Sequence, residues 1–148
     1  MPDMYSYPGT ELDLFAKAIR WKTYFSSILN RYVQGDVLEV GAGTGINQPY
    51  LMNESVSSWT SLEPDAALLQ QLKEWMDMTS QPVSQRLIVG ALSSLPDTER
   101  FDSILYVDVL EHIEADAAEL RQAAHLLKPG GRIVVLAPAH PSLMSPFD

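Results

Sequence analysis

Three glycines and two carboxylates are the residues of this chain whose types and spacing could hold a ligand. Gly41, Gly43 and Gly45 alternate with other residues, Glu39 lies two positions before the first of them, and Glu63 lies 18 positions after the last. Glycine lets the backbone turn sharply and lets a ligand approach the main chain without a Cβ clash. A carboxylate at position 63 can accept both hydroxyl protons of a ribose.

The spacing of the glycines distinguishes two kinds of nucleotide cofactor. A dinucleotide fingerprint needs a third glycine at position 46, where this chain has Ile46. The spacing found suits a cofactor that has ribose and adenine but no pyrophosphate, and S-adenosylmethionine is such a cofactor. Its sulfonium is a cation, and a loop with nearby acids and no Lys or Arg favours a cation over a diphosphate. A tight turn without any ligand is the alternative for such a loop.

Hydrophobic periodicity predicts the elements that position these residues. The apolar spacing of residues 11–33 indicates a helix, with Lys22 interrupting its apolar stripe. Asp65 can cap a second helix. Short apolar runs predict five strands, at residues 37–40, 58–63, 86–89, 101–107 and 132–136. The other expected elements are a short helix ending near residue 52, a loop or irregular helix within 90–100, and a helix over 114–127 that Pro129-Gly130-Gly131 ends.

Strands that alternate with helices predict an α/β, Rossmann-like, doubly wound and mostly parallel sheet with helices on both faces. Ligands of such a sheet bind beyond the carboxyl ends of the strands, where the strand order reverses. The glycine loop ends the first strand and Glu63 ends the second. We predict one domain over residues 1–148, in which residues 1–35 form an N-terminal lead-in and helix.

Composition excludes several classes of site and partner. The 148 residues include 10 Lys plus Arg, 19 Asp plus Glu and no Cys, so disulfides, zinc–thiolate sites and a cysteine nucleophile are absent. No basic block could follow a phosphate backbone, so we expect no nucleic-acid partner. No apolar run approaches the ~20 residues of a membrane span, and no basic leader precedes one. We therefore expect no membrane partner and a cytoplasmic location.

Five ordered motifs resemble those of class I S-adenosylmethionine-dependent methyltransferases. The resemblance runs from about Trp21 to Asp148 and implies an enzyme that uses S-adenosyl-L-methionine to methylate a small-molecule acceptor. The motifs are VLEVGAGTG (37–45), WTSLEPD (59–65), FDSILYVDVLEHI (101–113), LLKPGGRIVVLAPAHPSL (126–143) and SPFD (145–148).

The resemblance also implies roles for single residues. It places the methionine part of the cofactor on the three glycines, its amino end at Glu39, and its ribose hydroxyls on Glu63. It places Pro64 against the adenine. The remaining residues implied to lie at the cofactor are Ala42, Gly90, Ala91, Leu92, Val107 and Asp108. Ala91 departs from the common pattern, because many relatives have an Asp there whose carboxylate accepts from the adenine amino group.

Polar residues after the fourth and fifth strands are the candidates for catalysis. Methyl transfer from a sulfonium is an in-line displacement, so the protein mainly positions the acceptor. A carboxylate or imidazole can take the proton of a hydroxyl acceptor, which suggests Asp108, His112 and His140. Asp108, Glu111 and His112 could also supply ligands to a divalent ion. Three polar residues close in sequence do not define a coordination geometry, and we predict no metal.

Two aromatic residues and the last predicted strand suggest further contacts of the chain. Trp21 and Tyr24 could stack on the cofactor or pack in the core. The five strands are two fewer than the family's sheet has, which suggests a chain truncated before the acceptor region. An unpaired fifth strand promotes pairing with another chain, so we expect a homodimer through that edge or the C-terminal tail.

Two other functions compete with a methyltransferase. The first is a non-catalytic cofactor-binding or protein-interaction module on the same fold. The second is a nicotinamide-dependent oxidoreductase, which Ile46 disfavours. The sequence does not identify the acceptor, or whether the methyl group goes to oxygen, nitrogen or carbon.

Overall fold

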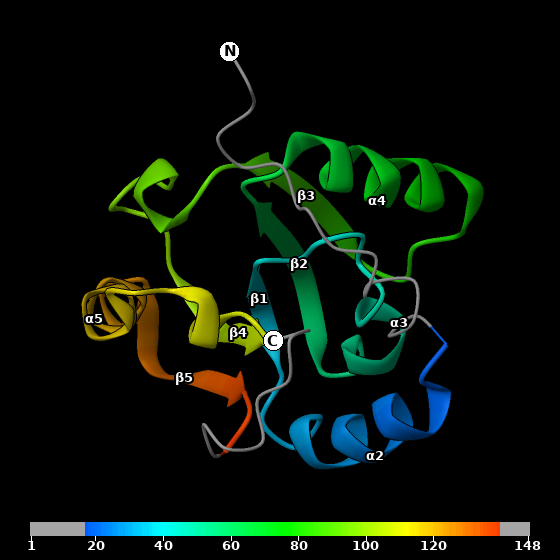
Figure 1. The fold of residues 1–148 in the computed structure, drawn as a ribbon, viewed down its shortest axis with the longest axis horizontal. Coiled ribbons are helices and arrows are strands. Elements are labelled where there is room, and N and C mark those ends of the chain that lie inside the picture. The colour runs from blue at the N-terminus through cyan, green and yellow to red at the C-terminus, as the bar shows by residue number, and fades with distance from the viewer. Residues whose placement is uncertain (1–16, 140–148) are drawn as a thin grey trace.

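Five runs of apolar residues pair side by side as one parallel sheet in the computed structural model, which describes residues 17–139 (Figure 1). The strand order is β3-β2-β1-β4-β5, so the chain moves outward from β1 in one direction and then outward from it in the other. This order confirms the doubly wound, Rossmann-like α/β class. The strands are β1 (Gly35–Val40), β2 (Val56–Glu63), β3 (Ser84–Val89), β4 (Phe101–Val107) and β5 (Leu127–Leu136).

Helices cover both faces of the sheet. Figure 1 shows α5 on one side of the sheet and α2, α3 and α4 on the other. The helices are α2 (Ile19–Leu29), α3 (Gln48–Leu51), α4 (Ala66–Met78) and α5 (Asp116–His125), and two 3₁₀ turns are η1 (Leu92–Ser94) and η2 (Leu110–His112). The interval that the sequence left as loop or irregular helix therefore contains η1.

Alternation along β1 divides the core into two parts. Val37 packs with Trp59 of β2 and with residues of α2 and α3. The next residue, Leu38, belongs to the apolar cluster on the opposite face, together with Ala123 of α5. Successive side chains of a strand point to opposite faces, so a strand buried on both sides reads as a continuous apolar run. Glu39 interrupts that run, and its side chain is buried on the α2 and α3 face.

The predicted N-cap of α4 is present. The carboxylate of Asp65 accepts hydrogen bonds from the backbone N–H groups of Ala67, at 2.8 Å, and Leu68, at 3.3 Å. These bonds satisfy donors that have no partner within the helix. The helix begins at Ala66, directly after its cap, so only Pro64 and Asp65 separate it from the end of β2 at Glu63.

The first helix is shorter than its apolar spacing predicted. Within the described chain it begins at Ile19 and ends at Leu29 instead of residue 33, because a turn begins at Asn30 and the N–H of Tyr32 donates to the carbonyl of Leu29. Residues 11–16 of the prediction lie outside the described residues. Lys22 does not interrupt the buried stripe, because its stem is buried and its ammonium reaches the carbonyl of Ile46 at 3.3 Å.

The boundary between α5 and β5 also differs from the prediction. The helix covers residues 116–125, and the strand already begins at Leu127, before the Pro-Gly-Gly segment that was expected to end the helix. Phe101 pairs with Leu127 and Ser103 pairs with Arg132, so residues 128–131 form a bulge in β5. The bulge presents the ammonium of Lys128 to Asp36 and Asp102 at the starts of β1 and β4. Proline and glycine thus mark an irregular edge strand here.

Two further features bear on partners. Among the described residues β3 and β5 are the edge strands of the sheet. No helix within residues 17–139 has the length and apolar character needed to cross a membrane.

We expect the loop after β1 to tolerate a methyl group at Gly45 poorly. Gly45 has φ +74°, and a Cβ there would lie 2.4 Å from Cδ1 of Leu72 on α4. Gly45→Ala should lower the free energy of unfolding by about 2–4 kcal/mol, through left-handed strain and overpacking. Gly130→Ala is the matched control, because Gly130 has φ +79° but, among the residues that the structure describes, no atom within 4 Å of its Cβ position. Urea denaturation should show a clearly smaller loss for Gly130→Ala, and equal losses would contradict this packing.

Candidate cofactor-binding site

The loop after β1 turns at glycines that the surrounding packing requires. The N–H groups of Gly41 and Ala42 both donate to the carbonyl of Leu62, at 2.8 and 3.1 Å, which holds the turn against the end of β2. A Cβ on Gly41 would lie 2.6 Å from a methyl of Val109, in the loop after β4. The glycine loop and the loop after β4 are therefore in close contact at the point where the strand order reverses. Ala42 directs its own side chain into a small core with Leu69 and Leu72 of α4.

Gly43 differs from the other two glycines of the loop. It has φ +55°, yet among residues 17–139 no atom beyond its chain neighbours lies within 4 Å of the position that its Cβ would take. Packing of the described residues therefore does not explain the missing side chain, and they leave the space beside this residue open. A ligand can approach the main chain here, which is the use of glycine that the sequence suggested.

Glu63 lies across from Gly43 and connects the end of β2 with the glycine loop and the start of α4. One carboxylate oxygen accepts the Gly43 N–H at 2.8 Å, and the other accepts the Asp65 N–H at 2.9 Å. Burial raises the pKa of this carboxyl group, and the two backbone hydrogen bonds act in the opposite direction. The carboxylate thereby links the glycine loop to the start of α4. Each of its oxygens has lone pairs beyond the one used by the backbone.

A cavity of about 260 Å³ adjoins the residue after Glu63. The N–H of Gly90 donates to the carbonyl of Glu63 at 3.0 Å, and the N–H of Ala91 donates to Oγ of Ser94 at 3.2 Å, so the loop after β3 is tied to the end of β2. The cavity is lined by Pro64, Val89, Gly90, Ala91, Ser93 and Ser94. Three of the expected residues are therefore in its wall, whereas the side chain of Leu92 is buried in the core.

Val89, Ser93 and Ser94 were not found from the sequence. The available signal was the run of small residues from Gly90 to Ser94, which leaves room beside a backbone turn.

Glu39 lies beneath the loop and is 2 % exposed. Its carboxylate accepts a hydrogen bond from Nε1 of Trp59 at 3.1 Å and lies 3.5 Å from the amide nitrogen of Gln48. Burial raises its pKa to about 7, opposed by these two hydrogen bonds, and the nearby charge of Glu63 acts in the same direction as burial. The sequence did not reveal Trp59 and Gln48 as partners, because the first contact depends on the register of β1 with β2 and the second on how α3 packs under the loop.

The end of β4 supplies the remaining candidates. Val107 is buried in the core, and Asp108 is exposed with φ +52°, the only positive φ outside glycine among the described residues. The Asp108 N–H donates to the carbonyl of Leu136 at 2.8 Å, which fixes the sharp turn. His112 is exposed and Glu111 is partly buried in η2. His140 lies outside the described residues.

The metal alternative gains no support from this geometry. Within the described part of the chain, no three His, Asp or Glu side chains are grouped so that they could hold an ion. Asp108, Glu111 and His112 are near each other in sequence but do not form such a group.

One cation lies beside the loop against expectation, and two aromatic residues of α2 do not pack in the core, which was one of the two alternatives for them. Lys22 of α2 contacts the carbonyl of Ile46, so a positive charge does lie beside the glycine loop, and burial lowers its pKa. Trp21 and Tyr24 are both exposed on α2 and are not core residues. Their rings lie 5.9 Å apart between centroids.

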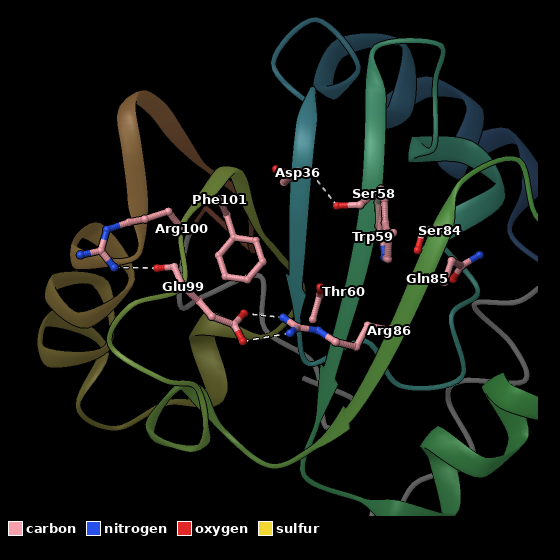
Figure 2. A pocket seen from close by; sticks show the side chains of 10 residues that line it. All are labelled: Asp36, Ser58, Trp59, Thr60, Ser84, Gln85, Arg86, Glu99, Arg100 and Phe101. Atoms are coloured by element: carbon pink, nitrogen blue, oxygen red, sulfur yellow. Dashed lines mark hydrogen bonds and ion pairs between the residues drawn. The ribbon is translucent and has the colours of Figure 1, made fainter.

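A larger cavity, of about 360 Å³, lies at the opposite edge of the sheet (Figure 2). Asp36, Ser58 and Ser84 come from the starts of three strands and line one side of it. Figure 2 shows the guanidinium of Arg86 paired through two hydrogen bonds with the carboxylate of Glu99. Two charged residues that line this cavity, Arg86 and Glu99, are thus already paired with each other. The carboxyl edge, with an open glycine and two buried carboxylates, is the better candidate for ligand binding.

Comparison with known proteins identifies the family of the chain. The family described as methyltransferase domain matches residues 12–145. A demethylmenaquinone methyltransferase of Tropheryma whipplei is 32% identical over 144 residues, which are 96% of this chain and 59% of that protein. A tRNA U34 carboxymethyltransferase of Pseudoalteromonas atlantica is 28% identical over 116 residues, which are 78% of this chain and 34% of that protein. The chain thus spans between about a third and three-fifths of the length of these relatives.

A solved structure shows the same fold. The S-adenosylmethionine-dependent methyltransferase of Clostridium acetobutylicum superposes with a TM-score of 0.65 at 20% sequence identity, over 84% of this chain and 55% of that one. At this identity the likeness concerns the fold alone.

The buried carboxyl group of Glu39 should make stability depend on pH. Its pKa is about 7 in the folded chain and 4.5 as a free side chain, so the folded state keeps the proton over this range while the unfolded state loses it. Stability should fall as pH rises from 4.5 to 7 and level off above. Glu39→Gln removes this loss, so its unfolding free energy relative to wild type should grow by up to about 3 kcal/mol between pH 4.5 and pH 8. The exposed Glu54→Gln serves as control, and parallel pH profiles for wild type and Glu39→Gln would refute the assignment.

Proposed function

The chain belongs to the methyltransferase domain family, and we propose that it binds S-adenosyl-L-methionine and transfers the methyl group to a small-molecule acceptor. The observation that carries the proposal is the pairing of an open Gly43 with the Glu63 carboxylate at the carboxyl edge of the sheet. We propose that residues 1–148 act as one domain in this reaction. A cytoplasmic location stays a prediction.

The residues at this edge fit the parts of the proposed cofactor. Glu63 would hold the ribose hydroxyls with the lone pairs that its two backbone donors leave free. The cavity beside Pro64 would take the adenine, with Ala91, Ser93 and Ser94 around it. Ala91 lacks a side-chain acceptor, and Oγ of Ser94 is the nearest hydroxyl to its backbone, at 3.2 Å from the Ala91 nitrogen. The methionine part would lie along Gly41 and Gly43.

The charges around the loop support a cationic ligand. Glu39 and Glu63 act on each other electrostatically, and within the described chain neither forms a salt bridge. A cation near two carboxylates favours their ionised forms and lowers the pKa of each. Glu39 would contribute this field from beneath the loop, through its charge and not through direct contact. Lys22 lies beside the loop, with its ammonium on the carbonyl of Ile46, and within the described chain it forms no salt bridge with either carboxylate.

The loop after β4 would position the methyl acceptor and take up its proton. When bound, S-adenosyl-L-methionine supplies a methyl carbon that its sulfonium already activates for displacement. Asp108 and His112 would orient the acceptor, and either could take a proton from an acceptor hydroxyl. The proximity of Val109 to Gly41 supports this role, because we propose that the methionine part lies along Gly41. We carry His140 as a third catalytic candidate on its sequence motif alone.

The acceptor class remains open between relatives. The named acceptors of the two sequence relatives are demethylmenaquinone and a tRNA nucleotide, U34. We propose a small molecule for this chain, because its 19 acidic residues against 10 basic ones disfavour binding of a polyanion by the chain as a whole.

Self-association through β5 is the second proposed partner interaction. β5 pairs with β4 alone among the described strands, and Val135 near its end is exposed. An edge strand can pair with a second copy. Sedimentation velocity should show a concentration-dependent dimer that Val135→Lys weakens. A monomer at all concentrations would end this proposal and leave the methyltransferase assignment intact.

Binding of the demethylated product S-adenosylhomocysteine should depend on Glu63. Thermal denaturation should show stabilisation by this compound and none by NAD. Glu63→Gln replaces one acceptor oxygen by an NH₂ group, so its dissociation constant should rise by about tenfold or more. Glu54→Gln, which changes an exposed carboxylate on the turn before β2, should bind as wild type does. Unchanged affinity in Glu63→Gln would refute the ribose assignment, and absence of stabilisation in wild type would refute the cofactor.

A further inference from the structure

Basic residues are concentrated at the start of the described chain. Residues 17–34 contain four of the ten Lys and Arg residues and none of the 19 Asp and Glu residues. The remaining chain therefore carries six basic and all 19 acidic residues. This segment therefore carries four positive charges and no negative charge, in a chain whose formal net charge is −9.

The same segment also exposes large apolar side chains. Its inner side is buried through Lys22, Phe25, Ser26 and Leu29. Eight large hydrophobic residues of the described chain are exposed, and five of them are here: Ile19 (60 %), Trp21 (45 %), Tyr24 (60 %), Ile28 (41 %) and Tyr32 (47 %). Such a concentration within one short segment marks an interaction surface, whereas single exposed hydrophobics do not.

Cationic and apolar residues share the outer side of the helix. Arg20, Tyr24 and Ile28 follow one another at intervals of four residues, so they lie on one face of α2, and Arg31 lies in the turn that follows the helix. All four are exposed, and the helix face opposite to Arg20, Tyr24 and Ile28 carries the buried residues. Figure 1 shows α2 at the periphery of the molecule, with α3 and the sheet on one side of it only. We call these four residues, with Trp21, the outer face of α2.

We propose that the outer face of α2 binds the surface of an anionic lipid membrane. Guanidinium groups attract anionic headgroups, and Trp, Tyr and Ile side chains enter the boundary between headgroups and acyl chains. No acidic side chain within residues 17–34 opposes this contact. The expectation of no membrane partner rested on the absence of a spanning segment, which a helix lying on the surface does not need.

Other occupants fit this face less well. Single-stranded RNA could stack on the aromatic rings and pair with the guanidinium groups. A solvated nucleic acid would not, however, bury the exposed side chains of Ile19 and Ile28. Three exposed cations, Lys17, Arg20 and Arg31, are also few for a phosphate backbone. A second copy of the chain would supply acidic residues, which match the charge of the outer face but not its apolar side chains.

Vesicle flotation tests the proposal without using the cofactor. The full chain should float with vesicles of phosphatidylglycerol and phosphatidylcholine, and poorly with phosphatidylcholine alone. Arg20→Gln/Arg31→Gln should weaken partitioning to anionic vesicles by about 25-fold, since each cation at the surface contributes about fivefold. Tyr24→Ser/Ile28→Ser should weaken partitioning by a similar factor through loss of the apolar contact.

Matched variants elsewhere on the surface are the controls. Arg121→Gln/Arg132→Gln makes the same change of charge on α5 and β5, and Met78→Ser removes an exposed apolar residue at the end of α4. These should float as wild type does, and circular dichroism should show every variant folded.

Several results would overturn the proposal. They are absence of flotation in wild type, equal losses in the control variants, binding of single-stranded RNA in place of vesicles, or self-association that the α2 variants abolish while vesicles do not bind. S-adenosylhomocysteine binding is measured separately on the same variants, so a failure of membrane binding does not bear on the cofactor.

Discussion

The carboxylate of Glu63 holds the candidate site together. Its two oxygens accept backbone N–H groups from the glycine loop and from the start of α4, at 2.8 and 2.9 Å. These bonds offset part of the desolvation that burial imposes on the charged form. The glycine loop, the first turn of α4 and the cavity beside Pro64 are consequently fixed relative to one acidic group. Loss of that group would free the loop as well as remove an acceptor for a ligand.

The two edges of the sheet use charge in different ways. At the amino edge, Lys128 pairs with Asp36 and Asp102, and Arg86 pairs with Glu99, so the charges satisfy one another. At the carboxyl edge, Glu39 and Glu63 depend on hydrogen bonds from neutral groups and repel each other. The larger cavity is at the first edge, but the second has unbalanced negative charge and an open glycine. A cationic nucleoside therefore fits the carboxyl edge better than the larger cavity.

Much of this arrangement could be predicted from the sequence, where local patterns decide the outcome. The strand before the glycines, the Asp65 cap and the end of β2 depend on adjacent residues, and all were found. Partners brought together by packing were not found, such as Trp59 with Glu39, or Lys128 with the starts of β1 and β4. Lys22 was misjudged because its long stem can be buried while its ammonium reaches a distant carbonyl. The net charge of the whole chain also concealed the acid-free segment around α2.

An NMR titration of the ¹⁵N-labelled chain with S-adenosylhomocysteine tests the central claim most directly. The Gly43 amide proton is bonded to Glu63, so it reports on the carboxylate that we assign to the ribose. The account predicts saturable shifts concentrated at Gly43, Ala91, Ser93 and Ser94, with the amides of Arg86 and Glu99 unaffected. Shifts confined to the amino edge, or an unchanged spectrum at millimolar ligand, would contradict it.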